Sequence, residues 1–325
     1  MPDKRNFSCD KLTIITPVFN DWRCLTRLSL ELRDALAFVR QKSLVIVNDG
    51  SISAYDKHVS NEVLNSYESV KVINLGCNVG HQRAIAIGLS HTVSENQLGM
   101  VLVIDSDGED MPVDAGILVK TLLENKESIV VSKRSKRSEN KRFKASYLIY
   151  KTIFIMLTGK KIDFGNFSAF YMQSASRLAY MPDLWNHFPA TILKSRLPII
   201  KVSTTRGHRF EGYSRMNFIA LVNHGLASIS VLIDIAFARM LLFAIVIAFC
   251  LLITGVAIVL IKAFTPYAIP GWATMGTGLV SIGLLQILVL VSLVSFLALS
   301  ARSNFNRPTI RTALDYISSV HDLKP

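Results

Sequence analysis

The fold is decided by one stretch in the first half of the chain, Val101-Leu-Val-Ile-Asp105-Ser-Asp107-Gly-Glu109-Asp110. A hydrophobic run leads directly into a cluster of acidic residues, and a glycine there permits a tight turn. A buried strand that ends in carboxylates is suited to holding a divalent cation against a phosphorylated ligand. A solvated acidic loop would have the same sequence, so the rest of the chain has to separate the two interpretations.

Strands and helices alternate around this stretch. The hydrophobic and β-branched runs predict strands at Leu12–Pro17, Ser43–Asn48, Val70–Leu75, Met100–Ile104 and Ser128–Ser132. Helical patterns lie between them at about Trp22–Arg40 and Gly80–His91. This alternation predicts an α/β fold, a Rossmann-like and mainly parallel sheet with right-handed crossovers.

Polar loops follow three of these strands, at Pro17–Asp21, Asn48–Ser51 and Asp105–Asp110. Ligands of parallel α/β sheets bind outside the carboxyl ends of the strands. We therefore expect the chemistry of this protein at one edge of the sheet, where the three loops meet.

Two long stretches near the C-terminus carry no charge. They run from Met240 to Ile261 and from the residue after Lys262 to the residue before Arg302. Each exceeds the roughly 20 residues that a helix needs to cross a bilayer. Prolines and a glycine within Phe264–Gly271 interrupt the helical pattern between them. The sequence predicts a transmembrane hairpin, and a buried helical pair in a soluble core is the alternative.

Basic residues flank the hairpin on one side. Arg239 precedes it and Arg302, Arg307 and Arg311 follow it, whereas the connecting loop carries only Lys262. The positive-inside rule then places both termini in the cytoplasm. The N-terminus lacks the apolar region of a signal peptide, and four scattered cysteines fit a reducing compartment. We expect a multi-pass protein of the bacterial inner (plasma) membrane with its large N-terminal part in the cytoplasm.

The predicted organisation has four parts: a domain over 1–217, an interfacial helix region over 218–237, the hairpin over 238–301 with spans at about 240–262 and 274–300, and a cytoplasmic tail over 302–325. The net charge is +12, and basic runs lie at Lys133–Arg137 and Lys141–Lys144. Beside transmembrane spans, this charge favours anionic headgroups and a phosphorylated ligand over nucleic acid.

Five motifs, in their order along the chain, resemble a known family. They are Thr16-Pro-Val-Phe-Asn-Asp21, Val47-Asn-Asp-Gly-Ser51, Asn78-Val-Gly-His-Gln82, Asp105-Ser-Asp107 and Arg209-Phe-Glu-Gly-Tyr-Ser-Arg215. The chain looks like a family 2 glycosyltransferase of the GT-A fold. More closely, it is similar to the polyprenyl-phosphate glycosyltransferases, which include dolichol-phosphate mannose synthases and bactoprenol glucosyltransferases. The resemblance implies a nucleotide-sugar donor, a polyprenyl (undecaprenyl) phosphate acceptor in the membrane, inversion at the sugar, and Mg²⁺ or Mn²⁺; a homo-oligomer is left open.

The resemblance also implies roles for individual residues. Those implied for donor binding are Pro17, Asn20, Asp21, Asp49, His81, Gln82, Arg134 and Arg137. Asp105 and Asp107 correspond to the DxD motif and would bind the metal, with Glu109 as a further candidate ligand. Asp105, Asp107, Arg209 and Arg215 would be catalytic, and Ser214 with Arg215 would bind the acceptor phosphate.

The chain departs from the family pattern at several positions. Asn48 stands where relatives have the first of two aspartates, Phe19 and Asp21 alter the first motif, and Asn166 replaces an acid in Asp163-Phe-Gly-Asn166-Phe167. These departures leave open which sugar and which base the donor carries.

Other functions remain alternatives. A lipid phosphate is already ionised near neutral pH and needs no strong base, whereas a sugar hydroxyl would need one, with Asp110 or Asp163 as candidates. Transfer to a hydroxyl of a lipid-linked sugar or glycan is therefore one alternative. A non-catalytic nucleotide-binding membrane protein is another, and a processive polysaccharide synthase is disfavoured because its Q-x-x-R-W signature is missing.

Overall fold

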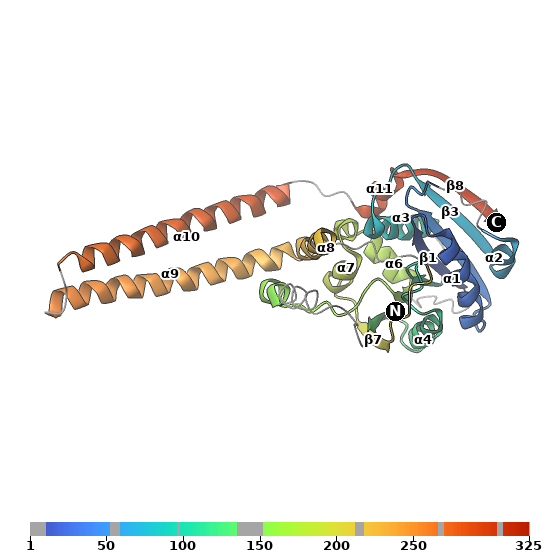
Figure 1. The fold of residues 1–325 in the computed structure, drawn as a ribbon, viewed down its shortest axis with the longest axis horizontal. Coiled ribbons are helices and arrows are strands. Elements are labelled where there is room, and N and C mark those ends of the chain that lie inside the picture. Colours follow the sequence, from blue (N-terminus) through green and yellow to red (C-terminus); the bar gives the residue numbers. More distant parts are fainter. Residues whose placement is uncertain are drawn as a thin grey trace, which may run out of the picture. The chain divides into compact units, whose positions relative to one another are not determined.

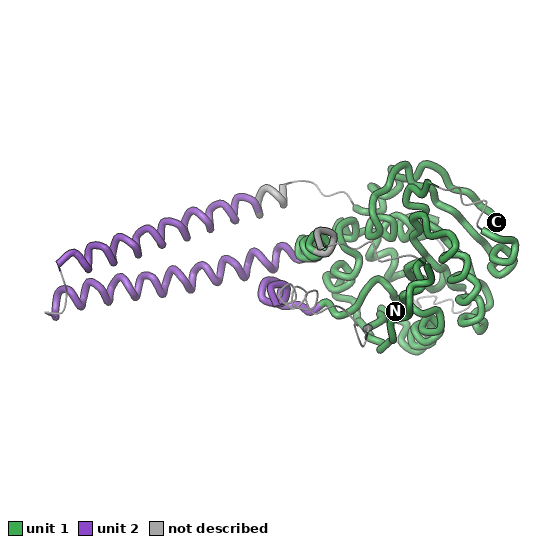
Figure 2. The backbone as a smooth tube through the Cα atoms, viewed as in Figure 1, with its two compact units in different colours: residues 1–146, 162–231, 307–325 green, residues 147–161, 232–306 purple. Residues whose placement is uncertain are grey.

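The structure is a computed structural model that describes residues 11–52, 59–95, 98–134, 152–211, 218–265, 270–303 and 308–324. The chain divides into two compact units (Figure 2). Unit 1 comprises residues 1–146, 162–231 and 307–325, and unit 2 comprises residues 147–161 and 232–306.

Unit 1 contains an eight-stranded sheet in the order β7-β5-β6-β4-β1-β2-β3-β8. Figure 1 labels four of its strands, β1, β3, β7 and β8. Its strands are β1 Lys11–Val18, β2 Gln41–Asn48, β3 Ser69–Leu75, β4 Met100–Val103, β5 Ile129–Arg134, β6 Ser168–Tyr171, β7 Ile199–Thr204 and β8 Ile317–Lys324. β1 pairs in parallel with β2 and β4, β2 with β3, and β5 with β7. The pairs β4–β6, β5–β6 and β3–β8 are antiparallel. The predicted α/β class and mainly parallel sheet are confirmed, and the five expected strands correspond to β1 to β5.

Helices connect the strands, and further helices follow β7 in the chain. They are α1 Trp22–Ala35, α2 Asn61–Ser66, α3 His81–Ser94, α4 Pro112–Glu124, α6 Met172–Ala179, η2 Pro182–Trp185, α7 Phe188–Lys194, α8 Phe218–Val231, α9 Ile233–Phe264, α10 Trp272–Ser303 and α11 Thr309–Leu314. The first helix ends at Ala35, earlier than the expected Arg40. The Lys42 ammonium donates to the carbonyls of Leu36 and Val39 and so satisfies acceptors where the helix stops.

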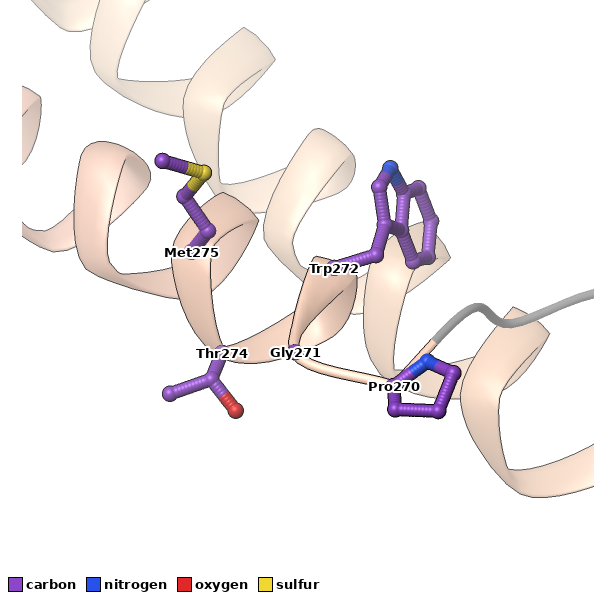
Figure 3. Close-up of a pocket in the computed structure, with 5 residues that line it drawn as sticks. All are labelled: Pro270, Gly271, Trp272, Thr274 and Met275. Carbon is purple, nitrogen blue, oxygen red and sulfur yellow. The ribbon is translucent and has the colours of Figure 1, made fainter.

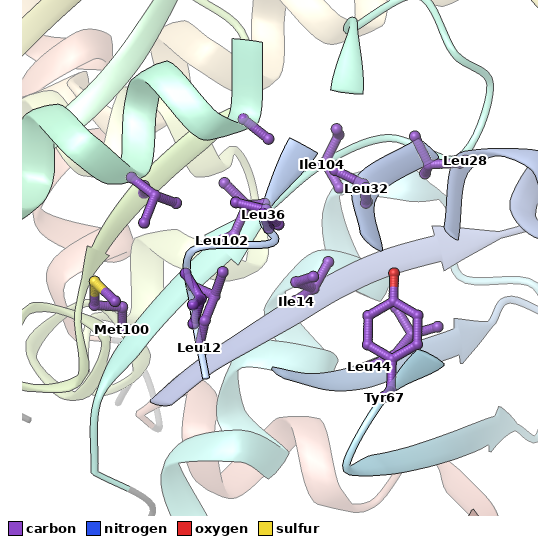
Figure 4. Packing of buried hydrophobic residues seen from close by; sticks show 14 of the residues in the cluster. Leu12, Ile14, Leu28, Leu32, Leu36, Leu44, Tyr67, Met100, Leu102 and Ile104 are labelled. Carbon is purple, nitrogen blue, oxygen red and sulfur yellow. The ribbon is translucent and has the colours of Figure 1, made fainter. Parts of the chain in front are cut away.

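Two hydrophobic clusters lie on opposite faces of the sheet, because alternate residues of a strand point to opposite sides. One cluster contains Leu12 and Ile14 of β1 with Leu28 and Leu32 of α1 (Figure 4), and it also contains residues of α4. The other contains Ile15 of the same strand with residues of α3, α6, α7 and α11. At Gly88 of α3 an added Cβ would lie 2.6 Å from a Val47 methyl group, so this helix can approach the sheet closely only with glycine.

The chain returns to the sheet after the apolar helices. β8 pairs with β3, and the Lys324 ammonium donates to the backbone carbonyls of Leu64 and Tyr67. The Asn74 amide also donates to the Ser319 hydroxyl at 3.1 Å. Residues 308–324 therefore form part of unit 1, whereas the sequence predicted only a tail there.

Unit 2 contains two helices that are long and apolar enough to cross a membrane, Ile233–Phe264 and Trp272–Leu297. They pack against each other, and an added Cβ at Gly276 of α10 would lie 3.0 Å from Ile258 of α9. In the most apolar part of each helix no residue is buried, so these helices do not form the core of a soluble domain. A surface hollow at the start of α10 is lined by Pro270, Gly271, Trp272, Thr274 and Met275 (Figure 3). None of these residues carries charge, so the hollow does not suit a diphosphate.

A short helical segment at residues 152–158 also belongs to unit 2. The Arg239 guanidinium of α9 donates to the carbonyls of Ile155 and Met156 at the end of this segment, at 3.4 and 3.2 Å. An arginine that satisfies the last carbonyls of a helix caps it. Ile153 and Met156 expose 47% and 62% of their surface, so the segment presents an apolar face.

Candidate active site

The loops after β1 and β2 are joined by side chains at the carboxyl edge of the sheet. Asn20 has a positive φ of 58°, which asparagine tolerates better than most residues. Its backbone N–H donates to the Ser51 hydroxyl, and its side-chain oxygen accepts the N–H of Ile52, both at 2.9 Å. The Asn48 side chain accepts the N–H of Ser51 at 3.0 Å. Asn20 and Asn48 therefore fix the shape of this edge.

Asp49 is buried at the end of β2 and organises the turn before α3. Its two carboxylate oxygens accept the backbone N–H groups of Val79 and Gly80 at 2.7 and 3.1 Å. The Asn78 side chain donates to the Asp49 carbonyl at 2.9 Å. Burial raises the pKa of Asp49, although the two N–H groups favour its charged form. This turn places His81 and Gln82 at the start of α3.

Asp105, at the end of β4, lies within a polar network. Its carboxylate is 3.1 Å from Nε2 of His81 and 3.5 Å from the Asn166 amide nitrogen. The Asn166 amide nitrogen lies 2.8 Å from the same His81 nitrogen. Desolvation lowers the pKa of His81, but the carboxylates of Asp105, Asp107 and Asp49 outweigh it and the pKa is raised.

Asp107 faces Arg209, which comes from a loop about a hundred residues later in the chain. The Arg209 guanidinium is 3.6 Å from the Asp107 carboxylate and 2.7 Å from that of Asp21. Burial raises the pKa of Asp107, and the neighbouring Asp105 carboxylate raises it further. Two carboxylates that disfavour each other's charge are stabilised by a cation placed between them.

Residues 206–211 lie over the turn at Asp107 and Gly108. The N–H of Phe210 donates to the Asp107 carbonyl, and the N–H of Gly207 donates to the Glu109 carbonyl, both at 2.9 Å. Gly108 has a φ of +81°, and an added Cβ there would lie 2.5 Å from the Phe210 ring. The ring is also stacked under the Arg27 guanidinium at 4.2 Å. Glycine is therefore required at position 108 for both conformation and space.

Glu109, the further candidate metal ligand, faces a cation of its own. Its carboxylate is paired with the Arg206 guanidinium. Among the residues that the structure describes, no group of three or more His, Cys, Asp and Glu side chains is arranged to hold a metal ion.

The site nevertheless fits a divalent cation in part. Asp105 and Asp107 offer hard oxygen ligands that Mg²⁺ and Mn²⁺ accept, and the raised pKa of Asp107 indicates negative charge in need of compensation. Mg²⁺ commonly takes one or two carboxylates together with phosphate oxygens of the substrate. Two aspartates would therefore suffice if a diphosphate supplied further oxygen ligands.

Most of the predicted site residues meet at this edge. Pro17 is part of β1, while Asn20, Asp21, Asp49, His81, Gln82, Asp105, Asp107 and Arg209 belong to the loops or helix starts described above. Arg137, Ser214 and Arg215 lie outside the described residues, as does the side chain of Arg134.

Two other functional candidates were not identified from the sequence. Arg206 holds Glu109, and Phe210 packs on the turn between the aspartates. Both belong to a loop that the sequence connected only with phosphate binding. Their pairing with a strand end about a hundred residues away left no local signal in the sequence.

The two aspartates follow central strand β4 at the carboxyl end of the sheet, which is where ligands of parallel α/β sheets bind. Residues 13–183 match the sequence pattern of Glycosyl transferase family 2, and the chain belongs to this family. The protein is a glycosyltransferase.

Curated relatives are distant. An uncharacterized glycosyltransferase of Synechocystis sp. is 26% identical over 67% of this chain and 68% of its own length. The undecaprenyl-phosphate 4-deoxy-4-formamido-L-arabinose transferase of Proteus mirabilis is 23% identical over 66% of this chain and 65% of its own. The uncharacterized glycosyltransferase YkoT of Bacillus subtilis is 26% identical over 85% and 83%.

Solved structures resemble the chain more weakly. Glucosyl-3-phosphoglycerate synthase of Mycobacterium tuberculosis, solved with Mn²⁺, UDP-glucose and phosphoglyceric acid, has a TM-score of 0.48 at 16% identity and covers 70% of this chain and 80% of its own. TarS of S. aureus has a TM-score of 0.41 at 15% identity, with 60% of each chain covered. The fold assignment rests on the strand order and register described above.

Proposed function

We propose that this glycosyltransferase moves a sugar from a nucleotide-sugar donor to a polyprenyl phosphate in the membrane, with inversion and with a divalent metal ion. One observation carries the choice of acceptor: the described carboxylates around the site already have partners. Asp49 accepts two backbone N–H groups, Asp21 pairs with Arg209, and Glu109 pairs with Arg206. A phosphate acceptor is already ionised and does not require a free carboxylate as a base.

Of the two residues that could serve as a base for a hydroxyl acceptor, Asp163 is paired with lysines and Asp110 is buried. Asp163 is held by the ammonium groups of Lys201 and Lys133, at 2.7 and 3.6 Å. Asp110 is only 3% exposed, and its backbone forms a bridge with Arg206. Position 166, where the family resemblance implies an acid, carries an amide. These features support an acceptor that is a nucleophile without deprotonation.

Catalysis would then consist of positioning two anions and neutralising the charge that develops on the leaving group. Asp105 and Asp107 would hold Mg²⁺ or Mn²⁺, which supplies positive charge to the donor diphosphate. Arg209 is paired with Asp107 and Asp21, so it lies where a phosphate could exchange for a carboxylate. Ser214 and Arg215 would bind the acceptor phosphate, and Pro17, Asn20, Asp21, Asp49, His81, Gln82, Arg134 and Arg137 would border the donor.

A lipid acceptor also fits the connection of the chain to its apolar helices. The chain leaves unit 1 after Val231 and returns to it with residues 308–324, so both ends of the hairpin connect to the same folded unit. The basic residues at those ends support a location of unit 1 on the cytoplasmic side of a bacterial inner membrane. Trp272 at the start of α10 is 43% exposed, as expected of an aromatic residue at the opposite membrane interface.

Two further segments fit the headgroup region. α8 exposes Val222 and Leu226 one helical turn apart, and it directly precedes the first apolar helix. The segment at 152–158 exposes apolar side chains, is capped by Arg239, and is followed by the exposed Lys160 and Lys161. Apolar side chains flanked by lysines are typical of segments at a bilayer surface.

Purified protein in vesicles, incubated with polyprenyl phosphate and a panel of labelled nucleotide sugars, tests the proposal. One donor should yield a labelled lipid, and EDTA should abolish the reaction. Arg215→Ala should reduce kcat/KM about ten- to a hundredfold because a charge-assisted phosphate contact is worth about 1.5–3 kcal/mol. Arg215→Lys should retain part of the activity, since a point charge still attracts phosphate. Transfer to a glycan hydroxyl and none to polyprenyl phosphate would replace this proposal by its alternative.

A further inference from the structure

Asn166 is the centre of a chain of hydrogen bonds that begins at a helix and ends at Asp105. The first backbone N–H of α7, that of Phe188, donates to the side-chain oxygen of Gln82 at 2.8 Å. The amide nitrogen of Gln82 donates to the side-chain oxygen of Asn166 at 3.0 Å. The amide nitrogen of Asn166 then faces Asp105 at 3.5 Å and His81 at 2.8 Å.

The direction of this chain is fixed by its first member. A backbone N–H can only donate, so Gln82 must present its oxygen to Phe188 and its nitrogen to Asn166. Asn166 must in turn present its oxygen to Gln82, which leaves its N–H₂ group directed at the Asp105 carboxylate. Turning either amide would set two nitrogens or two oxygens against each other within this chain. The orientation requires Nε2 of His81, 2.8 Å from the Asn166 nitrogen, to act as an acceptor, as it does in the neutral ring that carries its proton on Nδ1.

An amide and an acid at position 166 would have different effects, because only the amide can donate a hydrogen bond to the Asp105 carboxylate. An aspartate there would direct an oxygen at Asp105, next to Asp107, whose pKa is already raised by burial and by Asp105. The neutral amide instead donates to Asp105 and restricts where its carboxylate can lie. The start of α7 is itself fixed, because the buried His187 ring accepts the N–H of Ala190 at 3.1 Å.

We propose that Asn166 is a positioning residue, which orients Asp105 for the metal-bound donor and takes its own orientation from the start of α7 through Gln82. Gln82 then contributes to the donor site through Asn166. This inference rests on the proposed role of Asp105 as a metal ligand. Residues that orient metal ligands typically change metal affinity or activity by about 10- to 100-fold when mutated.

The test measures equilibrium binding of Mn²⁺ together with UDP or GDP, whichever the wild-type protein binds, to Asn166→Ala, Gln82→Ala and the double variant. Each single variant should weaken binding about tenfold and raise the donor KM, while the acceptor KM stays unchanged. The double variant should lose little more than either single one, because all three break one chain. Asn125→Ala is the matched control: its side-chain amide donates to the Thr121 carbonyl at the C-terminal end of α4, the end opposite to the site.

Binding within twofold of the wild type in Asn166→Ala would overturn the inference, and so would single losses that add in the double variant. Gln82→Ala keeps the test valid if Asn166→Ala does not fold, because it leaves Asn166 itself in place. Asp105→Ala separates this inference from the proposed function. If Asp105→Ala binds Mn²⁺ and nucleotide normally, the metal role of Asp105 fails. If Asp105→Ala binds them weakly and Asn166→Ala binds them normally, only the positioning role of Asn166 fails.

Discussion

Two strand ends at the same edge of the sheet use aspartate in opposite ways. Asp49, at the end of β2, gives both oxygens to backbone N–H groups that cannot move away. Asp105 and Asp107, after β4, face the side chains of His81, Asn166 and Arg209, which can exchange for another partner, although one oxygen of Asp107 also accepts the N–H of Glu109 at 3.0 Å. The partners of an aspartate, more than its position at a strand end, thus distinguish a residue that shapes the site from one available to a ligand.

Removal of Asp107 should have the largest effect on activity. We expect Asp107→Ala to lower kcat/KM by about a hundredfold or more, since it removes a ligand of the charge-neutralising metal. Its thermal unfolding should change less than that of Asp49→Ala, because Asp107 accepts one backbone N–H, that of Glu109 at 3.0 Å, whereas Asp49 accepts two. Initial rates with and without EDTA, together with an unfolding curve, check both parts; a fully active variant would refute the role.

Arg209 should show an intermediate effect. Arg209→Ala removes a cation shared by Asp21 and Asp107, and loss of one charge-assisted contact costs about 1.5–3 kcal/mol, or roughly ten- to a hundredfold in kcat/KM. Arg27→Ala is the comparison variant, since that arginine stacks on Phe210 of the same loop and is paired with Glu31. Equal losses in the two variants would mean that Arg209 only supports the loop.

Asp49 should contribute more to stability than Asp107 does. Asp49→Ala leaves the N–H groups of Val79 and Gly80 without their acceptor, and we expect a loss of about 1–2 kcal/mol in unfolding free energy. Relief of a buried charge offsets part of the cost, consistent with the raised pKa of Asp49. Denaturant unfolding of Asp49→Ala and Asp107→Ala side by side measures the contrast. An unchanged stability for Asp49→Ala would remove the distinction between the two strand ends.

The smallest expected effect is on the pH dependence of stability, and it arises from His187, whose ring accepts a backbone N–H. Burial, and then the nearby His224, lower the pKa of His187 to about 3. The unfolded chain takes up a proton near pH 6.5 and the folded chain does not, so stability should fall as the pH falls through that range, by about 1 kcal/mol in the first unit below pH 6.5.

The matched variant is His187→Asn, which keeps a side-chain cap on α7 but cannot titrate. Its stability should depend less on pH than that of the wild type between pH 7.5 and about pH 5.5, since only the His187 proton is removed from the balance. Parallel pH profiles for the two proteins would show that His187 is not held neutral.

The central strands could be predicted because β1, β2 and β4 are continuous apolar runs that end in polar loops. β8 could not, because Ile317-Ser-Ser-Val-His-Asp-Leu-Lys324 is largely polar and is half exposed at the edge of the sheet. α9 and α10 begin earlier than the predicted spans, at Ile233 and Trp272, because helical structure extends beyond the uncharged stretches.

The residue types of the site could be predicted from the sequence, but the pairs that these residues form with one another were harder to predict. The sequence indicated Asp105 and Asp107, but the pairing of Glu109 with Arg206 joins residues far apart in the chain. Asn166 was visible only as a missing acid. Its function as a donor depends on the direction of a hydrogen-bond chain that starts at the backbone of Phe188, which no local pattern encodes.

The most direct test of the central claim compares two acceptors that differ only in their phosphate. Vesicles containing the protein would receive the active labelled nucleotide sugar with either polyprenyl phosphate or the corresponding polyprenol, in Mn²⁺ and in EDTA. The proposed function predicts a labelled lipid only with polyprenyl phosphate and Mn²⁺. Equal transfer to the polyprenol, or transfer that persists in EDTA, would contradict it.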